Sequence, residues 1–141
     1  MSAGRRRLSR QVKHLILLED NGDVAAMLAR LLGEQGYYVA CAMRAADACE
    51  VLQRVTADLL IADVLLPDGT CFAAVDIAKR KGLPYILMTG SYDQMVQLRT
   101  NGDFHLRKPF RLIAFMDEVR SRIGPGDGEG QTAPPRCANS P

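Results

Sequence analysis

The sequence predicts an α/β fold in which a doubly wound parallel sheet of five strands carries helices on both faces. Short apolar segments alternate with segments of helical periodicity along most of the chain, which is the pattern of repeated strand–helix units. The apolar segments are continuous rather than alternating, and this favours strands that are buried on both faces. Four of them end in polar residues, and the functional crevice of such sheets lies beyond the carboxyl ends of the strands.

Each expected element has a local signal. The five strands are expected at the short segments 15–18, 37–43, 58–64, 85–88 and 104–107. The first helix follows Asn21-Gly22-Asp23, which offers capping side chains, and it ends at Gly36. Its apolar stripe is expected at Val24, Met27, Leu28, Leu31 and Leu32.

The other helices follow in order along the chain. The second is expected around the apolar stripe of Ala48, Val51, Leu52 and Val55. Pro67-Asp68-Gly69, after the third strand, predicts a turn. The last three helices are expected over about residues 71–81, over a short segment at 94–99, and over about 112–123. The apolar stripe of the last helix is expected at Ile113, Met116, Val119 and Ile123.

Composition separates the two ends of the chain from a central domain. Residues 1–13 contain five basic and no acidic side chains, so they contribute +5 to a net charge of +2 and the rest of the chain contributes −3. We expect residues 1–11 to be a basic disordered arm, 12–123 to be one domain, and the Gly- and Pro-rich residues 124–141 to be a disordered tail.

The four cysteines show no CxxC or ligand-like spacing, and three of them fall within expected core elements. A free cysteine in a core acts as a small hydrophobic residue, so a reducing cytoplasm is the expected location. No apolar stretch approaches the roughly 18 residues that span a membrane, and no signal-peptide pattern opens the chain.

Polar residues follow four of the expected strands: Glu19-Asp20, Asp63, Thr89 and Lys108. A single Asp after a strand is most often a helix N-cap, and a single Lys is most often a surface residue. Three carboxylates on adjacent strand ends, however, repel one another unless a cation lies among them, and a few carboxylate oxygens suit Mg²⁺. The pattern therefore predicts a Mg²⁺ site, with Lys108 able to pair first with a carboxylate and later with a phosphoryl oxygen.

At these residues the chain resembles the receiver domain of bacterial two-component response regulators, in a single-domain, chemotaxis-regulator-like form, over about residues 12–123. Leu17-Leu18-Glu19-Asp20 resembles the acidic pair that helps to hold Mg²⁺, and Asp63 with the Leu-Pro-Asp-Gly turn after it resembles the phosphoacceptor. Met88-Thr89-Gly90 resembles the switch hydroxyl, and Lys108-Pro109-Phe110 resembles the Lys-Pro-Phe end, whose Lys–Pro peptide is typically cis. The resemblance also implies the flavodoxin-like strand order 2-1-3-4-5.

The chain departs from the family pattern at three places. Thr89 and Lys108 are 19 positions apart, a few fewer than in familiar regulators, which predicts a short fourth helix and loop. His105 stands where the family usually has Tyr or Phe, and Cys71 stands where it commonly has Gly. The site is intact, whereas the signalling face is altered.

The resemblance implies that Asp63 takes a phosphoryl group from the phosphohistidine of a histidine kinase or phosphotransferase, while Lys108 neutralises charge on the transferred oxygens. Thr89 and His105 would form the switch that responds to the phosphoryl group. Mg²⁺ is expected to be held by Glu19, Asp20, Asp63 and the backbone carbonyl of Leu65. The protein is not expected to be an enzyme beyond its own phosphorylation and dephosphorylation, and it needs no other cofactor.

The eighteen residues after Ile123 are too few for a DNA-binding module. The expected readout is therefore a downstream target protein or onward phosphate transfer, with no DNA-binding domain and no membrane contact. A pseudo-receiver that acts only as a protein-interaction module remains the alternative, and missing acids or a missing lysine would favour it. Phosphatases of the haloacid dehalogenase type need a second Asp where this chain has Leu65, and there is neither a GxGxxG motif nor a P-loop for a nucleotide.

Overall fold

A parallel sheet forms the centre of the computed structural model, which describes residues 12–128 and 136–137; the expected basic arm lies outside these residues. Six strands pair in the order β7-β6-β3-β1-β2-β8. They are β1 (His14–Leu18), β2 (Tyr38–Ala42), β3 (Leu59–Asp63), β6 (Tyr85–Thr89), β7 (His105–Arg107) and β8 (Arg136–Cys137). The five expected strands and their order are confirmed, and β8 is an addition beside β2.

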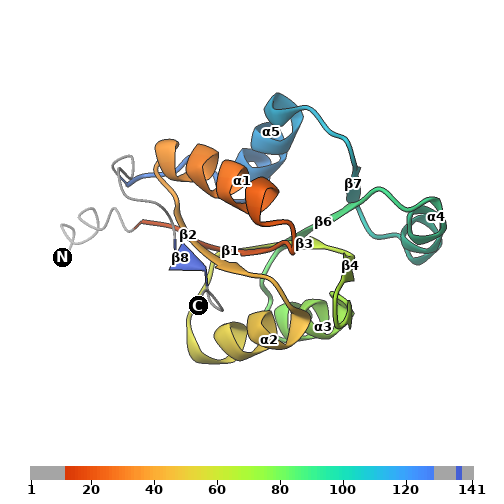
Figure 1. Ribbon diagram of the computed structural model, residues 1–141. Helices are drawn as coiled ribbons and strands as arrows, with labels where there is room; N and C mark the ends of the chain where they lie inside the picture. Colours follow the sequence, from red (N-terminus) through yellow and green to blue (C-terminus); the bar gives the residue numbers. More distant parts are fainter. Residues whose placement is uncertain (1–11, 129–135, 138–141) are drawn as a thin grey trace.

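Helices cover both faces of the sheet, as Figure 1 shows. They are α1 (Gly22–Glu34), α2 (Ala45–Arg54), α3 (Phe72–Arg80), α4 (Tyr92–Asn101) and α5 (Leu112–Ile123). Helices α1 and α5 lie on one face, α2 and α3 lie on the other, and α4 lies near the edge formed by β6 and β7. A small antiparallel hairpin of β4 (Leu65–Leu66) and β5 (Gly69–Thr70) connects β3 to α3, where the sequence predicts a turn.

Neighbouring residues of each central strand pack into different hydrophobic layers. In β1, Ile16 and Leu18 belong to the layer that includes α2 and α3, whereas Leu15 and Leu17 belong to the layer with α1 and α5. All four side chains are buried. Because both faces exclude water, a continuous apolar run is needed at this strand.

Three residues counted in the predicted helix stripes lie instead at the surface, and the most exposed of them is Ile113 of α5, at 68%. Val55 is 46% exposed and follows α2, which ends at Arg54. Met27 is 47% exposed on α1. Helical spacing alone therefore predicts a wider apolar face for these helices than the face that the fold buries.

Helix α4 is longer than the predicted segment 94–99, since it spans ten residues. The side chain of Ser91 caps its start by accepting a hydrogen bond from the backbone N–H of Gln94 at 3.3 Å. Gly102 ends the helix in the left-handed conformation, with φ of 78°. The loop before α4 is short, as predicted, because only Gly90 and Ser91 separate β6 from α4.

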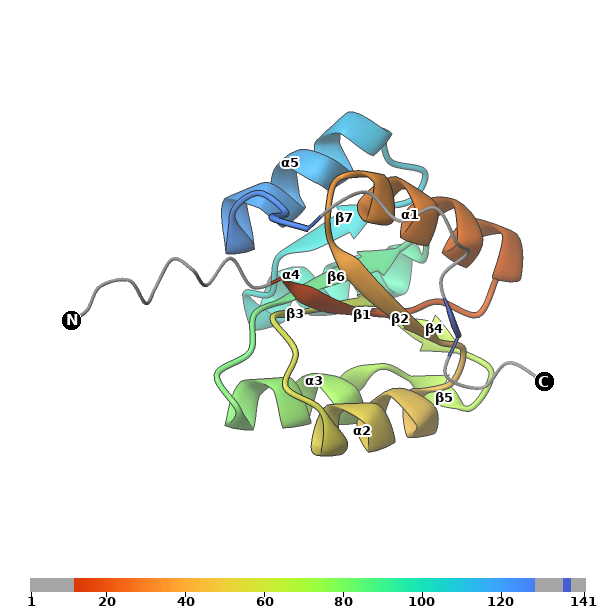
Figure 2. The ribbon, with the colours of Figure 1, turned by 90° about the vertical axis from the view of Figure 1, so that its left-hand side faces the viewer.

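Two stretches of the predicted disordered tail have defined contacts instead. Residues 124–128 pass beside the turn between α1 and β2, where the Gly128 N–H donates to the Gly36 carbonyl at 3.0 Å. The hydroxyl of Tyr37 donates to the carbonyl of Gly124 at 2.6 Å. Further along, β8 pairs in parallel with β2 at the edge of the sheet, visible in Figure 2.

The parallel register aligns the carboxyl ends of four strands. Leu18 pairs with Ala62 across β1 and β3, and Asp63 pairs with Met88 across β3 and β6. Beyond β7, the Lys108–Pro109 peptide is cis, as the resemblance implies. The polar residues that follow these strands therefore meet at one edge of the sheet.

The described residues include no helix with both the length and the apolar character needed to cross a membrane.

Candidate functional site

Three carboxylates converge at the ends of β1 and β3. Glu19 and Asp20 directly follow β1, and Asp63 is the last residue of β3. One carboxylate oxygen from each residue lies within 4.8 Å of the other two. This donor set of carboxylate oxygens fits a hard cation such as Mg²⁺, which also relieves the repulsion among the acids.

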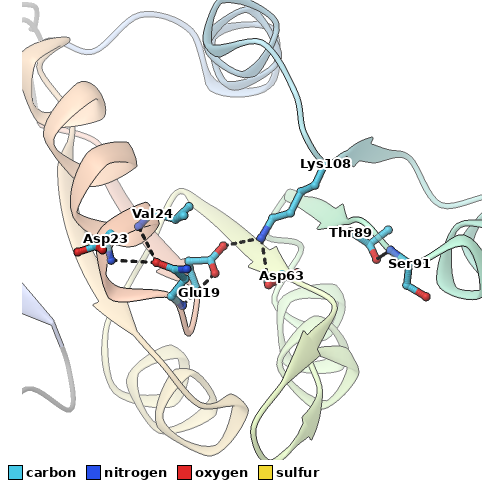
Figure 3. A network of polar contacts seen from close by, with 8 residues as sticks. Glu19, Asp23, Val24, Asp63, Thr89, Ser91 and Lys108 are labelled. Atoms are coloured by element: carbon cyan, nitrogen blue, oxygen red, sulfur yellow. Dashed lines mark hydrogen bonds and ion pairs between the residues drawn. The ribbon is translucent and has the colours of Figure 1, made fainter.

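The ammonium group of Lys108 reaches two of these acids, as Figure 3 shows. Its Nζ donates to Glu19 Oε1 at 2.9 Å and to Asp63 Oδ2 at 3.2 Å. Glu19 is buried, and its second oxygen accepts the backbone N–H of Asn21 at 3.1 Å. Lys108 is itself positioned by its backbone N–H, which donates to the Thr89 carbonyl at 2.8 Å. The ion pairs thus connect the ends of β1, β3 and β7.

Opposing influences act on the carboxyl group of Asp63. Burial raises its pKa most, and the negative charge of Glu19 adds to this effect. The positive charge and the hydrogen bond of Lys108 act in the opposite direction but do not outweigh them, so the pKa rises from 3.8 to about 6. Burial alone would lower the pKa of Lys108, but its hydrogen bond to Glu19 and the charge of Asp63 raise it overall.

Thr89 closes β6 and lies beside this cluster, toward α4. The residue is buried, and its hydroxyl oxygen accepts the backbone N–H of Ser91 at 3.1 Å. The hydroxyl therefore acts as a hydrogen-bond acceptor at the loop that begins α4. The structure brings Thr89 to the same edge of the sheet as the acids and Lys108, as the sequence predicts.

His105 and Leu65 were assigned roles through the family resemblance. His105 is half-buried on β7, and its Nδ1 atom is buried without a hydrogen-bond partner among the described residues. Leu65 follows Asp63 by two positions and begins the hairpin, with a side chain that is 46% exposed. Their roles as switch residue and carbonyl ligand stay predictions.

Sequence reasoning assigned Asp68 only to a turn, yet its carboxylate contacts a helix far along the chain. It accepts the backbone N–H groups of Ala45 at 3.0 Å and Ala46 at 3.2 Å, at the start of α2. The signal that could have revealed this contact is Arg44, which occupies the N-cap position and has no side-chain acceptor. A helix without a local cap needs acceptors from elsewhere.

The sheet, the acidic cluster and the lysine at the carboxyl ends of the strands together define a protein of the receiver class. The chain belongs to the response regulator receiver domain family, whose model matches residues 15–120.

Relatives and solved structures agree with this family. The chain is 30% identical over 130 residues to the phosphate regulon transcriptional regulatory protein PhoB of Pseudomonas aeruginosa, covering 83% of this chain and 56% of PhoB. It is 27% identical over 113 residues to the transcriptional regulatory protein DltR of Streptococcus agalactiae, covering 77% of this chain and 50% of DltR. The non-phosphorylated HemR receiver domain from Leptospira biflexa is 26% identical with a TM-score of 0.69, covering 79% of this chain and 94% of HemR. A CheY-like receiver domain protein from Methanospirillum hungatei is 20% identical with a TM-score of 0.72, covering 80% of this chain and 94% of that protein, and it supports the fold alone.

The comparisons correct one expectation. The chain spans about half the length of the curated relatives it matches, and these are named transcriptional regulatory proteins. The prediction of protein partners only, with no DNA-binding domain, is therefore wrong. It was drawn from the few residues after Ile123, which do not define the extent of a regulator of this family.

Proposed function

We propose that this receiver domain accepts a phosphoryl group on the carboxylate of Asp63 from a phosphohistidine donor, with Mg²⁺ bound beside it. The observation that carries the proposal is the ammonium group of Lys108, which lies between Glu19 and Asp63 at 2.9 Å and 3.2 Å. A fixed cation next to a partly buried nucleophile suits phosphoryl transfer, because catalysis there depends on positioning and charge.

The carboxylates of Glu19, Asp20 and Asp63 would hold the metal, with the backbone carbonyl of Leu65 as a further ligand. The mutual approach of three acid oxygens within 4.8 Å supports this assignment. When bound, Mg²⁺ supplies positive charge that offsets the charge of the incoming phosphoryl group.

Asp63 is the nucleophile in this proposal. A bond forms between its carboxylate oxygen and phosphorus while the bond from phosphorus to the donor's imidazole nitrogen breaks. The freed imidazole keeps the electron pair of the broken bond and takes a proton from solvent. With a pKa of about 6, the carboxyl group of Asp63 is largely ionised at neutral pH and can attack. Lys108 neutralises charge on the transferred oxygens, and no separate substrate is turned over.

The phosphoryl group then carries roughly −1.5 to −2 charge beside Thr89, in place of the single negative charge of the free carboxylate. The hydroxyl of Thr89, which accepts from Ser91 at 3.1 Å, would turn to donate a hydrogen bond to the phosphoryl oxygen. His105 would move into the space that Thr89 leaves, so the population shifts toward a second arrangement of α4, β7 and α5.

The test is to incubate the full chain with acetyl phosphate and Mg²⁺ and to measure its intact mass. We expect a gain of about 80 daltons, the mass of one phosphoryl unit, that Asp63→Asn removes and excess EDTA prevents. Asp76→Asn is a matched control, because it removes an exposed carboxylate on α3 away from the site. A native chain that gains no mass while its fold is intact would instead favour the pseudo-receiver.

A further inference from the structure

Helix α2 takes its N-terminal cap from outside its own segment. The N-cap residue is Arg44, whose side chain makes no capping hydrogen bond, and a guanidinium group can only donate. The missing acceptor is Asp68, which lies 23 positions from Ala45 in sequence and accepts the N–H groups of Ala45 and Ala46. These two backbone hydrogen bonds, with the nearby charge of Arg44, also lower the pKa of Asp68, so its carboxylate is ionised at neutral pH.

Asp68 stands at the tip of the hairpin that directly follows the proposed phosphoacceptor. The hairpin has only two residues in each strand, a length that is marginal without other support. Its base is closed by the Cys71 N–H, which donates to the Val64 carbonyl at 2.9 Å, and Leu66 is buried in the core. Pro67, Asp68 and Gly69 are exposed, and the carboxylate of Asp68 connects this tip to the start of α2.

We propose that Asp68 is a positioning residue for the phosphoacceptor site: by binding the start of α2, it fixes the β4–β5 hairpin so that the backbone of Leu65 faces the acidic cluster. This inference rests on the proposed function, in which the carbonyl of Leu65 would bind the same metal as Glu19, Asp20 and Asp63. Groups that orient metal ligands without touching the metal commonly change its affinity tenfold or more. The same two hydrogen bonds link the phosphoacceptor loop to α2, so a shift of the loop is transmitted to that helix.

The two roles of Asp68 can be separated, because a local cap for α2 can be restored while the hairpin stays detached from that helix. Asp68→Ala removes both hydrogen bonds. Asp68→Ala combined with Arg44→Ser gives α2 a side-chain oxygen at its own N-cap, whereas the hairpin tip stays unattached. Asp68→Asn keeps one acceptor oxygen, and Asp47→Asn is the matched control because it removes another carboxylate near the same end of α2, from its first turn.

Three quantities are measured on each variant of this chain: urea stability, the affinity for Mg²⁺ from an NMR titration in ¹⁵N-labelled protein, and amide hydrogen exchange of Leu65, Leu66 and residues 68–70. We expect Asp68→Ala to lose stability, to bind Mg²⁺ about tenfold more weakly and to exchange faster in the hairpin. The double variant should regain stability but not Mg²⁺ affinity or slow hairpin exchange. Asp68→Asn should be intermediate, and Asp47→Asn should bind Mg²⁺ like the native chain.

Recovery of Mg²⁺ affinity in the double variant would overturn the inference, because Asp68 would then be only a helix cap. Unchanged Mg²⁺ affinity in Asp68→Ala would overturn it as well. A native chain that binds Mg²⁺ but gains no phosphoryl group refutes the proposed function alone, and the variants still decide the role of Asp68. A native chain that binds no Mg²⁺ refutes both.

Discussion

Asp63 combines a partly buried position with two acidic neighbours, and this makes its charge costly in the metal-free protein. Its side chain is 13% exposed, and its pKa of about 6 lies above the ordinary value of 3.8. The folded chain therefore binds this proton more tightly than the unfolded chain does. Below about pH 4 both states are protonated, and above about pH 6 both are ionised, so the free energy of unfolding falls as the pH rises through this window.

The first prediction follows from this sign. In EDTA at pH 7.5, Asp63→Asn should have a higher free energy of unfolding than the native chain, because it removes an unfavourable charge while Lys108 keeps its ion pair with Glu19. A shift of about two pKa units corresponds to a gain of about 3 kcal/mol. The measurement is urea unfolding followed by circular dichroism at pH 4 and at pH 7.5.

At pH 4 the gain should shrink toward zero. Asp76→Asn, an exposed acid on α3, should show no such pH-dependent gain. If the gain in stability of Asp63→Asn over the native chain is no larger at pH 7.5 than at pH 4, the charge of Asp63 does not destabilise the folded state.

The principal residues of the candidate site were predictable because each one lies at the carboxyl end of a strand or directly after it. In a parallel sheet the carboxyl ends of strands share an edge, so Glu19, Asp63 and Lys108 could be placed together from their positions alone. The contact of Asp68 with α2 was not predictable in this way. It joins two loops, and loop contacts leave no periodic signal in the sequence; only the missing cap at Arg44 pointed to it.

At the scale of elements, the ends of helices were harder to predict than their presence. The limits of helix α5 at residues 112–123 agree with the prediction, although its stripe is correct only in part: Met116 and Val119 are buried, whereas Phe115 takes the buried place expected of Ile113. Helix α4 was predicted too short because its apolar side is weak, with Met95 and Leu98 as its buried residues. Its limits are set by capping groups rather than by apolar residues, so a pattern of hydrophobic positions could not find them.

The C-terminal segment shows the limit of composition as a guide. Gly and Pro predict disorder when a segment has no apolar side chains to bury. Here glycine instead permits close contact between two backbones: a Cβ atom on Gly126 would overlap the carbonyl oxygen of Gln35. Lys13 adds a hydrogen bond to the Pro125 carbonyl at 3.0 Å, and it approaches Asp127 at 3.9 Å.

The second prediction tests whether these contacts stabilise the domain. Gly126→Ala should displace residues 124–128 from the turn at Gly36, with a loss of about 1–2 kcal/mol in the free energy of unfolding. The amide of Gly128, which donates to the Gly36 carbonyl, should exchange faster with solvent. Urea unfolding and hydrogen exchange by NMR measure these two effects.

Gly22→Ala is the control for this substitution. No atom lies within 4 Å of a Cβ at Gly22, which is the first residue of α1. Alanine there should be neutral or slightly stabilising. If Gly126→Ala leaves both stability and the exchange of Gly128 unchanged, the contacts of residues 124–128 add nothing to the domain.

At the scale of the whole molecule, the site is a product of the fold. Glu19 and Lys108 are 89 positions apart, yet their charged groups lie 2.9 Å from each other. The acids are placed by β1 and β3 in the middle of the sheet, and the lysine follows β7 at its edge. Any ligand that binds these groups together therefore binds the folded state and not the unfolded chain, so it stabilises the molecule as a whole.

The last prediction is that Mg²⁺ and Asp20 change the stability of the domain in opposite directions. In EDTA, Asp20→Ala should be as stable as the native chain or more stable, because it relieves repulsion among three acids whose oxygens lie within 4.8 Å. At a Mg²⁺ concentration of about one hundred times the dissociation constant, the native chain should gain about 2.7 kcal/mol. This corresponds to a rise in Tm on the order of 10 °C.

Asp20→Ala should gain little from Mg²⁺, so the order of stability of the two proteins reverses, whereas Asp76→Asn should respond to Mg²⁺ like the native chain. Thermal unfolding with and without Mg²⁺ measures all three, and an equal rise in Asp20→Ala and in the native chain would mean that the metal binds elsewhere.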